Sequence, residues 1–226
     1  MAQGPIASEP SRTLREFRAM DQAIGIAAHQ ISCQRGGRTL FSRLSFALAP
    51  GEALFVSGPN GAGKTSLLRL IAGLLPLAAG RFSVAGPDAD TPLPQRCHYV
   101  GHASAVKNAL SVRENLAFWA EFLGGDAAAA DIALETFGLE PLAQLPAALL
   151  SAGQKRKLAL SRLFVAPRPV WLLDEPSVSL DAASVKLLDR AIAMHLKNGG
   201  IAIVASHTPL KVKFAHRLPL GTERAA

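Results

Sequence analysis

A run of eight residues, GPNGAGKT, occupies positions 58–65 and combines three glycines with a lysine and a threonine. Backbone N–H groups cradle a triphosphate best where glycines let the chain wrap closely around it. The lysine supplies a cation for the phosphate oxygens, and the threonine hydroxyl suits Mg²⁺. A simple glycine turn is the alternative, but a chance match of this kind has a probability on the order of one per cent. The sequence therefore predicts a phosphate site built from Gly58, Pro59, Asn60, Gly61, Ala62, Gly63, Lys64, Thr65 and Ser66.

Two acidic residues follow the apolar run VWLL at residues 170–173. On their own they are a weak signal, because buried strands often end in an aspartate that caps a turn. Beside a glycine loop, Asp174 can hold Mg²⁺ from the side opposite Thr65. Glu175 then lies next to the metal, where it can orient or deprotonate an attacking water. We therefore predict Asp174 and Thr65 as Mg²⁺ ligands and Glu175 as a catalytic residue.

Two further candidates have a structural interpretation beside the chemical one. In the segment LSAGQ, residues 150–154, Ser151 can cap a helix whose first amides, with that of Gly153, present donors to a phosphate. Taken alone, the segment is a capped helix. His207 follows the apolar run at 201–205, and a histidine there is often only a hydrogen-bonded structural residue.

These motifs need elements that bring them together at one sheet edge. Short apolar runs alternate with helical patterns, which predicts a mainly parallel sheet with crossover helices. We expect strands at residues 53–57, 81–85, 170–173 and 201–205, helices at 64–72, 127–137, 151–164 and 182–196, and a loop at 87–94. Ser111 and Glu114 match a capping box for another helix that runs through Phe122. The predicted fold is an α/β core interrupted by an α-helical subdomain at about 103–166.

Length and composition set broad limits. The 226 residues suit one large α/β domain, and 49% apolar with only 18% charged residues argues against global disorder. The longest apolar stretch, at 67–79, is broken by Arg69, Gly73 and Pro76, so we expect a soluble or peripheral protein. Residues 1–22 are predicted to be a flexible extension, in which Met20 is an alternative start to Met1, and residues 221–226 a short tail.

The charged and sulfur-containing residues carry little functional signal. The formal net charge of +7 suggests anionic neighbours, but the basic residues are scattered. Their one cluster, Lys155 with Arg156 and Lys157, is interpreted equally well as solvated surface. Cys33 and Cys97 lack metal or redox spacing and are interpreted as reduced, buried residues.

The order of the motifs resembles the ATP-binding cassette of ABC transporters over most of residues 23–220. The resemblance implies one domain with a P-loop NTPase, RecA-like core, an antiparallel β subdomain and the helical subdomain, acting on ATP with Mg²⁺. It also implies a head-to-tail dimer of two copies. In that dimer Ser151, Ala152, Gly153 and Gln154 form a signature that reaches the nucleotide of the other subunit. His207 would be the switch histidine, and Asp181 the acidic residue of the loop between subunits.

Three positions depart from the common pattern of that family. Ala152 stands where the commonest signature has glycine, and a methyl group should fit there. His102 stands where most cassettes have a glutamine, and Arg35 where an aromatic residue usually stacks on adenine. A guanidinium can stack on a base, but Arg35 is equally well explained as a solvated charge in a Gln-Arg-Gly-Gly turn. His102 and Arg35 are therefore tentative site residues.

Several segments narrow the resemblance to the ATP-binding subunits of cytochrome c maturation, which implies that ATP drives haem export or the release of haem from a membrane-bound complex. They are RTLFSRLSF at 38–46, YVGHASAVK at 99–107, LSVRENLAF at 110–118 and LSAGQKRKLALSRL at 150–163. Members of that branch also carry Gly-His before the helical subdomain. The resemblance implies a peripheral ATPase on the cytoplasmic face of the bacterial inner membrane, with integral membrane transporter subunits as partners. The chain has no C-x-x-C-H motif, so we expect haem to be handled only by those partners.

Other functions stay open at this point. One is an ABC ATPase subunit for another cargo, such as a lipid, a drug or a small solute. Another is a nucleic-acid- or ribosome-associated ABC protein that uses the basic charge, although no direct nucleic-acid contact is expected. A third is a regulatory module that binds nucleotide without turnover, and the presence of Glu175 and His207 argues against it.

Overall fold

The computed structural model describes residues 23–221 except residues 88, 127 and 209. The predicted extension at 1–22, with Met1 and Met20, and residues 222–226 of the predicted tail lie outside the described residues. The strands are β1 (Gly25–Arg35), β2 (Arg38–Leu48), β3 (Ala53–Ser57), β4 (Ala79–Ala85), β5 (Cys97–Val100), β6 (Val170–Asp174), β7 (Ile201–Ala205) and β8 (His216–Pro219). The α-helices are α1 (Lys64–Ile71), α2 (Val112–Phe122), α3 (Ala129–Thr136), α4 (Ala152–Ser161) and α5 (Ala182–Lys197).

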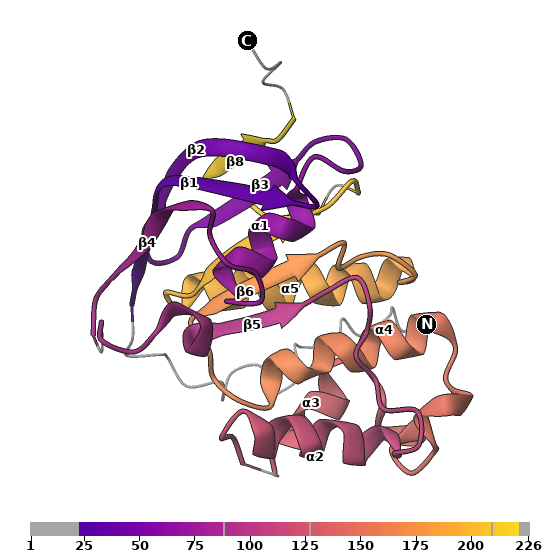
Figure 1. Cartoon of the computed structure of the whole chain (residues 1–226). Coiled ribbons are helices and arrows are strands. Elements are labelled where there is room, and N and C mark those ends of the chain that lie inside the picture. Colours follow the sequence, from indigo (N-terminus) through magenta and orange to yellow (C-terminus); the bar gives the residue numbers. More distant parts are fainter. Residues whose placement is uncertain (1–22, 88, 127, 209, 222–226) are drawn as a thin grey trace, which may run out of the picture.

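Two sheets form the core (Figure 1). The strands β2, β1 and β4 pair side by side in an antiparallel sheet. The second sheet has the order β5-β6-β7-β3-β8, and all its pairs are parallel. This arrangement confirms the predicted α/β class with a parallel core and an antiparallel β subdomain.

The central strands β6 and β7 are buried along their whole length, which is why their sequences are continuously apolar. Alternate side chains of β6 pack into two separate hydrophobic cores, one on each face of the sheet. Val170 and Leu172 pack on the side of α1 and the antiparallel sheet. Trp171 and Leu173 pack on the opposite side with α5 and the helical subdomain. The parallel sheet therefore lies between two hydrophobic layers, with its carboxyl ends free to carry polar residues.

The helices α2, α3 and α4 gather at one end of the molecule, next to β5 (Figure 1). The capping box predicted at the start of α2 is present, since Glu114 N donates to Ser111 Oγ at 3.2 Å and Ser111 N donates to Glu114 Oε2 at 2.7 Å. The predicted cap of α4 is present too, with Ser151 as its N-cap. Local hydrogen bonding thus sets where both helices begin.

Some predicted boundaries differ from the structure. The helix expected at 151–164 changes after Ser161 to a 3₁₀ turn, Arg162–Phe164. There Ser161 Oγ donates to Lys157 O at 3.0 Å, a bond of the kind that bends helices. The loop expected at 87–94 ends inside a 3₁₀ helix, Leu93–Arg96, because proline fits a first helical turn.

Two other short 3₁₀ helices, Glu140–Leu142 and Ala147–Leu149, complete the helical subdomain. None of the described helices is long and apolar enough to span a bilayer. Both cysteines are buried free thiols, as predicted. Burial raises the pKa of the Cys97 thiol to about 12, which keeps it protonated and unreactive.

Candidate active site

The glycine loop joins β3 to α1 and can be made only with glycine at certain positions. Gly58 has φ +139, and a Cβ there would lie 2.4 Å from Leu220 O. Gly63, the N-cap of α1, has φ +101, and its Cβ would lie 3.1 Å from the Phe41 ring. Side chains at these positions would strain the backbone and collide with Leu220 and Phe41. The loop therefore presents bare backbone at the N-terminus of a helix, which suits an anion.

A cavity of about 760 Å³ opens above this loop. Most of the residues predicted from the sequence line it, although they come from widely separated segments: Arg35, Asn60, Gly61, Gly63, Lys64, Thr65, Ser66, His102, Asp174, Glu175 and His207. Gly58 and Pro59 do not line the cavity, but their carbonyl oxygens accept hydrogen bonds from Lys64, which does. Ala62 is buried within the loop. The fold thus brings the phosphate loop, the two acids and His207 into one place.

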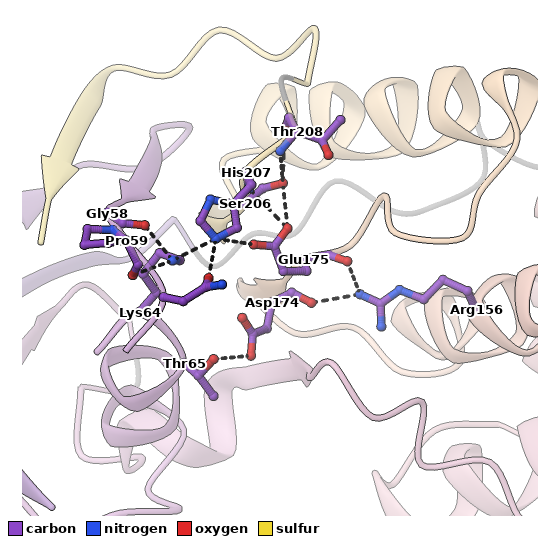
Figure 2. Close-up of polar contacts among 11 residues, drawn as sticks. Gly58, Pro59, Lys64, Thr65, Arg156, Asp174, Glu175, Ser206, His207 and Thr208 are labelled. Atoms are coloured by element: carbon purple, nitrogen blue, oxygen red, sulfur yellow. Dashed lines mark hydrogen bonds and ion pairs between the residues drawn. The ribbon is translucent and has the colours of Figure 1, made fainter. Parts of the chain in front are cut away.

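The ammonium group of Lys64 is held by its own loop and by His207 (Figure 2). Its Nζ donates to Gly58 O at 2.7 Å and to Pro59 O at 3.1 Å, and it lies 3.0 Å from His207 Nε2. His207 Nε2 also lies 3.0 Å from Asn60 Oδ1. A buried cation is therefore positioned at the centre of the loop, with partners that an anionic ligand could replace.

Thr65 and Asp174 face each other across the loop. Thr65 Oγ1 donates to Asp174 Oδ2 at 2.8 Å, and Asp174 is only 2% exposed. Burial raises the pKa of Asp174, while the bond from Thr65 opposes that shift. A hydroxyl oxygen beside a buried carboxylate is a set of hard oxygen donors, which Mg²⁺ prefers. These residues fit the metal predicted from the sequence.

Glu175 occupies a constrained place at the end of β6. Its φ of +47 is left-handed, and its N–H donates to Ala205 O at 2.7 Å. The carboxylate oxygen Oε2 accepts from Ser206 Oγ at 3.2 Å and from His207 N at 3.1 Å (Figure 2). The other oxygen, Oε1, is buried and has no hydrogen-bond partner among the described residues, although His207 Nε2 lies 3.6 Å away. The carboxylate is therefore held in orientation through Oε2, while Oε1 keeps its capacity to accept a hydrogen bond.

The signature segment, Leu150–Gln154, does not line this cavity. Ser151 Oγ accepts from Gln154 N at 3.2 Å, while Ser151 and Ala152 are exposed at the end of α4. A Cβ on Gly153 would lie 2.8 Å from Ser179 O, so this residue packs against the loop before α5. The geometry within one chain therefore separates the signature from the phosphate loop.

Asp181 also lies outside the cavity lining and is largely occupied by capping α5. Its Oδ1 accepts from Ser184 N and Oγ, each at 2.7 Å. These bonds, with Lys157 at 3.4 Å, lower the pKa of Asp181 to about 2.

The two tentative site residues, His102 and Arg35, both line the cavity. His102 is exposed in the loop after β5, on the side of Asp174. Arg35 ends β1, where it pairs with Arg38, and Leu40 lines the cavity beside it. Within the part of the chain that the structure describes, neither side chain is held by a hydrogen bond.

The sequence leaves the place of Arg156 open, because its basic cluster is interpreted equally well as solvated surface. In the structure Arg156 is only 4% exposed. Its guanidinium donates to backbone carbonyls at the end of β6, next to both acids (Figure 2). Hydropathy does not reveal that Arg156 is buried, because the burial of an arginine depends on its hydrogen-bond partners in space and not on its neighbours in sequence.

The fold and the site together define an ATP-binding cassette. A family model described as ABC transporter matches residues 41–178. The solved structure of a putative ABC transporter ATP-binding protein from Pyrococcus furiosus has the same fold, with a TM-score of 0.76 at 22% identity, and covers 89% of this chain and 100% of that one.

Curated relatives specify the branch. Cytochrome c biogenesis ATP-binding export protein CcmA of Rhodopseudomonas palustris (strain BisB5) is 51% identical over 187 residues, covering 83% of this chain and 94% of that protein. CcmA of Nitrobacter winogradskyi is 48% identical over 196 residues, covering 87% and 98%. The chain therefore belongs to the CcmA family of ABC transporter ATP-binding proteins and is an ATPase.

Proposed function

We propose that the chain is the ATP-hydrolysing subunit of a transporter complex that serves cytochrome c biogenesis. The relatives' shared name and their near-complete coverage support this assignment. The β- and γ-phosphates of ATP would occupy the loop at 58–66, where Lys64 exchanges its present carbonyl and histidine partners for phosphate oxygens. His207 would then be released from Lys64 to contact the γ-phosphate.

Thr65 and Asp174 would hold Mg²⁺. When bound, the metal neutralises charge on the phosphates and orients them. The chain's own contribution is to keep Asp174 ionised and correctly placed despite its burial, through the hydroxyl of Thr65. A metal-independent site would have no evident use for this buried pair.

Glu175 is the proposed general base. The observation that carries this role is its carboxylate, with Oε2 fixed by Ser206 and His207 and Oε1 buried without a hydrogen-bond partner among the described residues. Oε1 is therefore the atom that would accept the proton of the attacking water. His207, 3.6 Å from this oxygen, would share in placing the water and the γ-phosphate.

We further propose that two copies form a head-to-tail dimer. Ser151 to Gln154 lie outside the cavity of their own chain, yet they expose a capped helix end that suits a phosphate. A second copy would place this signature over the nucleotide, with Asp181 in the loop that meets it. Bound ATP would join the two subunits, and hydrolysis would release them.

The partners would be integral membrane subunits of the cytochrome c maturation system, with this chain peripheral on the cytoplasmic face of the inner membrane. The proposal assigns the handling of haem to those partners.

Affinity purification of the tagged protein from detergent-solubilised membranes, followed by mass spectrometry, tests this function. Co-purification of haem-handling membrane proteins is the expected result. An unrelated permease would retain the ATPase and refute the cytochrome c role. Ribosomal or DNA-binding proteins would refute the membrane assignment altogether. The Lys64→Ala variant is a matched control, because a partner that binds outside the nucleotide cavity should still co-purify when nucleotide binding is lost.

A further inference from the structure

The guanidinium of Arg156 connects three segments that meet at the active site. Nε donates to Pro176 O at 3.1 Å, and Nη1 donates to Gly101 O at 2.7 Å. Nη2 donates to Asp174 O and to Glu175 O, each at 2.8 Å (Figure 2). The side chain thus donates hydrogen bonds to three consecutive carbonyls of residues 174–176, called here the acidic segment, and to one carbonyl of the loop that leads to His102.

The identity of the side chain follows from this arrangement. A planar guanidinium offers donors in a fixed fork, whereas the ammonium of a lysine is a point charge that cannot match four carbonyls in this layout. Arg156 is buried, and burial lowers its pKa, while the nearby carboxylates of Asp174 and Glu175 oppose that shift. Burying a cation costs free energy even when backbone oxygens accept its hydrogen bonds, which indicates a role beyond packing.

The segment that it holds is under backbone constraint. Glu175 has a left-handed φ of +47, a conformation that persists in a non-glycine residue only when its surroundings impose it. On one side Glu175 N is bonded to Ala205 O, and on the other side Arg156 bonds Glu175 O. The direction of the Glu175 side chain depends on this backbone, and so on both contacts.

Resting on the proposed function, we infer that Arg156 is a positioning residue for the general base Glu175. It comes two residues after Gln154, in the first turns of α4, so it also connects the signature to the base of its own chain. A displacement of the N-terminal end of α4 would move the guanidinium and, through it, the Asp174–Pro176 backbone. The role is distinct from that of the phosphate loop, which Arg156 does not contact.

Arg162, the C-cap residue of α4, provides a matched control. It is also a buried arginine, it donates to Tyr99 O, and it lies over the Trp119 ring at 4.9 Å. It has no bond to residues 174–176. Loss of Arg162 therefore tests general anchoring of α4 without touching the acidic segment.

The experiment measures single-turnover hydrolysis of radiolabelled MgATP by the full chain, with nucleotide affinity and thermal midpoint in parallel. Arg156→Gln should lower the hydrolysis rate about 100-fold, the cost of a misplacement of about 1 Å, while MgATP affinity stays near wild type. Arg156→Lys should lose most of the rate as well. Arg162→Gln should lower the thermal midpoint without this selective loss of rate.

A double-mutant cycle separates positioning from general structure. If Arg156 acts through the Glu175 carboxylate, adding Arg156→Gln to Glu175→Gln should cost little further rate. Equal losses in both backgrounds, wild-type rates for Arg156→Lys, or the same rate loss in Arg162→Gln would each overturn the inference. A Glu175→Gln variant with full activity would instead refute the proposed function, and the inference with it.

Discussion

Replacing Glu175 with glutamine tests the chemistry with the smallest change in shape. Ser206 Oγ and His207 N both donate hydrogen bonds to Oε2, so the amide oxygen of glutamine should take the position of Oε2. The amide NH₂ must then take the place of Oε1, where it presents hydrogens instead of a proton acceptor. Loss of a general base typically costs 10²–10⁴-fold in rate, and we expect a loss in that range.

Stability should change little in this variant. Weakening two charge-assisted hydrogen bonds costs about 1 kcal/mol each, and this is opposed by removing repulsion between Glu175 and Asp174. The thermal midpoint and the MgATP affinity should therefore remain close to wild type. Nucleotide would persist in the site, and the proposed dimer should accumulate.

The assay combines phosphate release with gel filtration in MgATP. A Glu175→Gln protein that keeps more than about a tenth of the wild-type rate would fall outside the range expected for a general base and refute that role. A protein that is inactive but remains monomeric in MgATP would refute the ATP-bridged dimer and leave the role of Glu175 intact. Glu121→Gln, at an exposed position on α2 outside the cavity lining, is a control for the loss of one negative charge.

Three other predictions concern nucleotide binding, the atypical histidine and acid stability. Lys64→Ala should weaken MgATP binding in calorimetry by at least about 100-fold, because breaking a buried charge pair costs about 3–5 kcal/mol, and unchanged affinity would contradict the phosphate assignment. His102→Gln should keep its ATPase activity, since most cassettes carry glutamine there, whereas complete loss would give the histidine a chemical role of its own. Burial lowers the pKa of His98 to about 3 and that of His195 to about 4, below the usual 6.5, so the unfolded chain binds more protons and stability falls as pH drops below about 6.5. Each of these histidines should lower the free energy of unfolding by about 2 kcal/mol when the pH falls to 5. The thermal midpoint of His98→Gln should therefore fall less steeply with acid than that of wild type. His29→Gln, a change at a partly exposed histidine, is the control and should behave like wild type.

Short-range features could be predicted because their causes lie within a few residues. The strand at 53–57, the strand at 201–205, the capping box at Ser111 and the helix cap at Ser151 follow from apolar runs and from hydroxyl-to-amide spacing. The last strand, His216–Pro219, could not be predicted. It is short, polar and mostly exposed, and it is a strand only because β3 offers it an edge.

The sequence by itself determined the chemistry that is available: a glycine loop with Lys64 and Thr65, an acidic pair after an apolar strand, and a capped signature helix. Only the tertiary structure decided how these groups are arranged. It directed Arg156 inward and left Glu175 Oε1 without a hydrogen-bond partner among the described residues. It also kept the signature out of its own chain's cavity. The physical reason is that these properties depend on contacts between segments far apart in the sequence, and no local pattern of polarity encodes which carbonyl a buried guanidinium will meet.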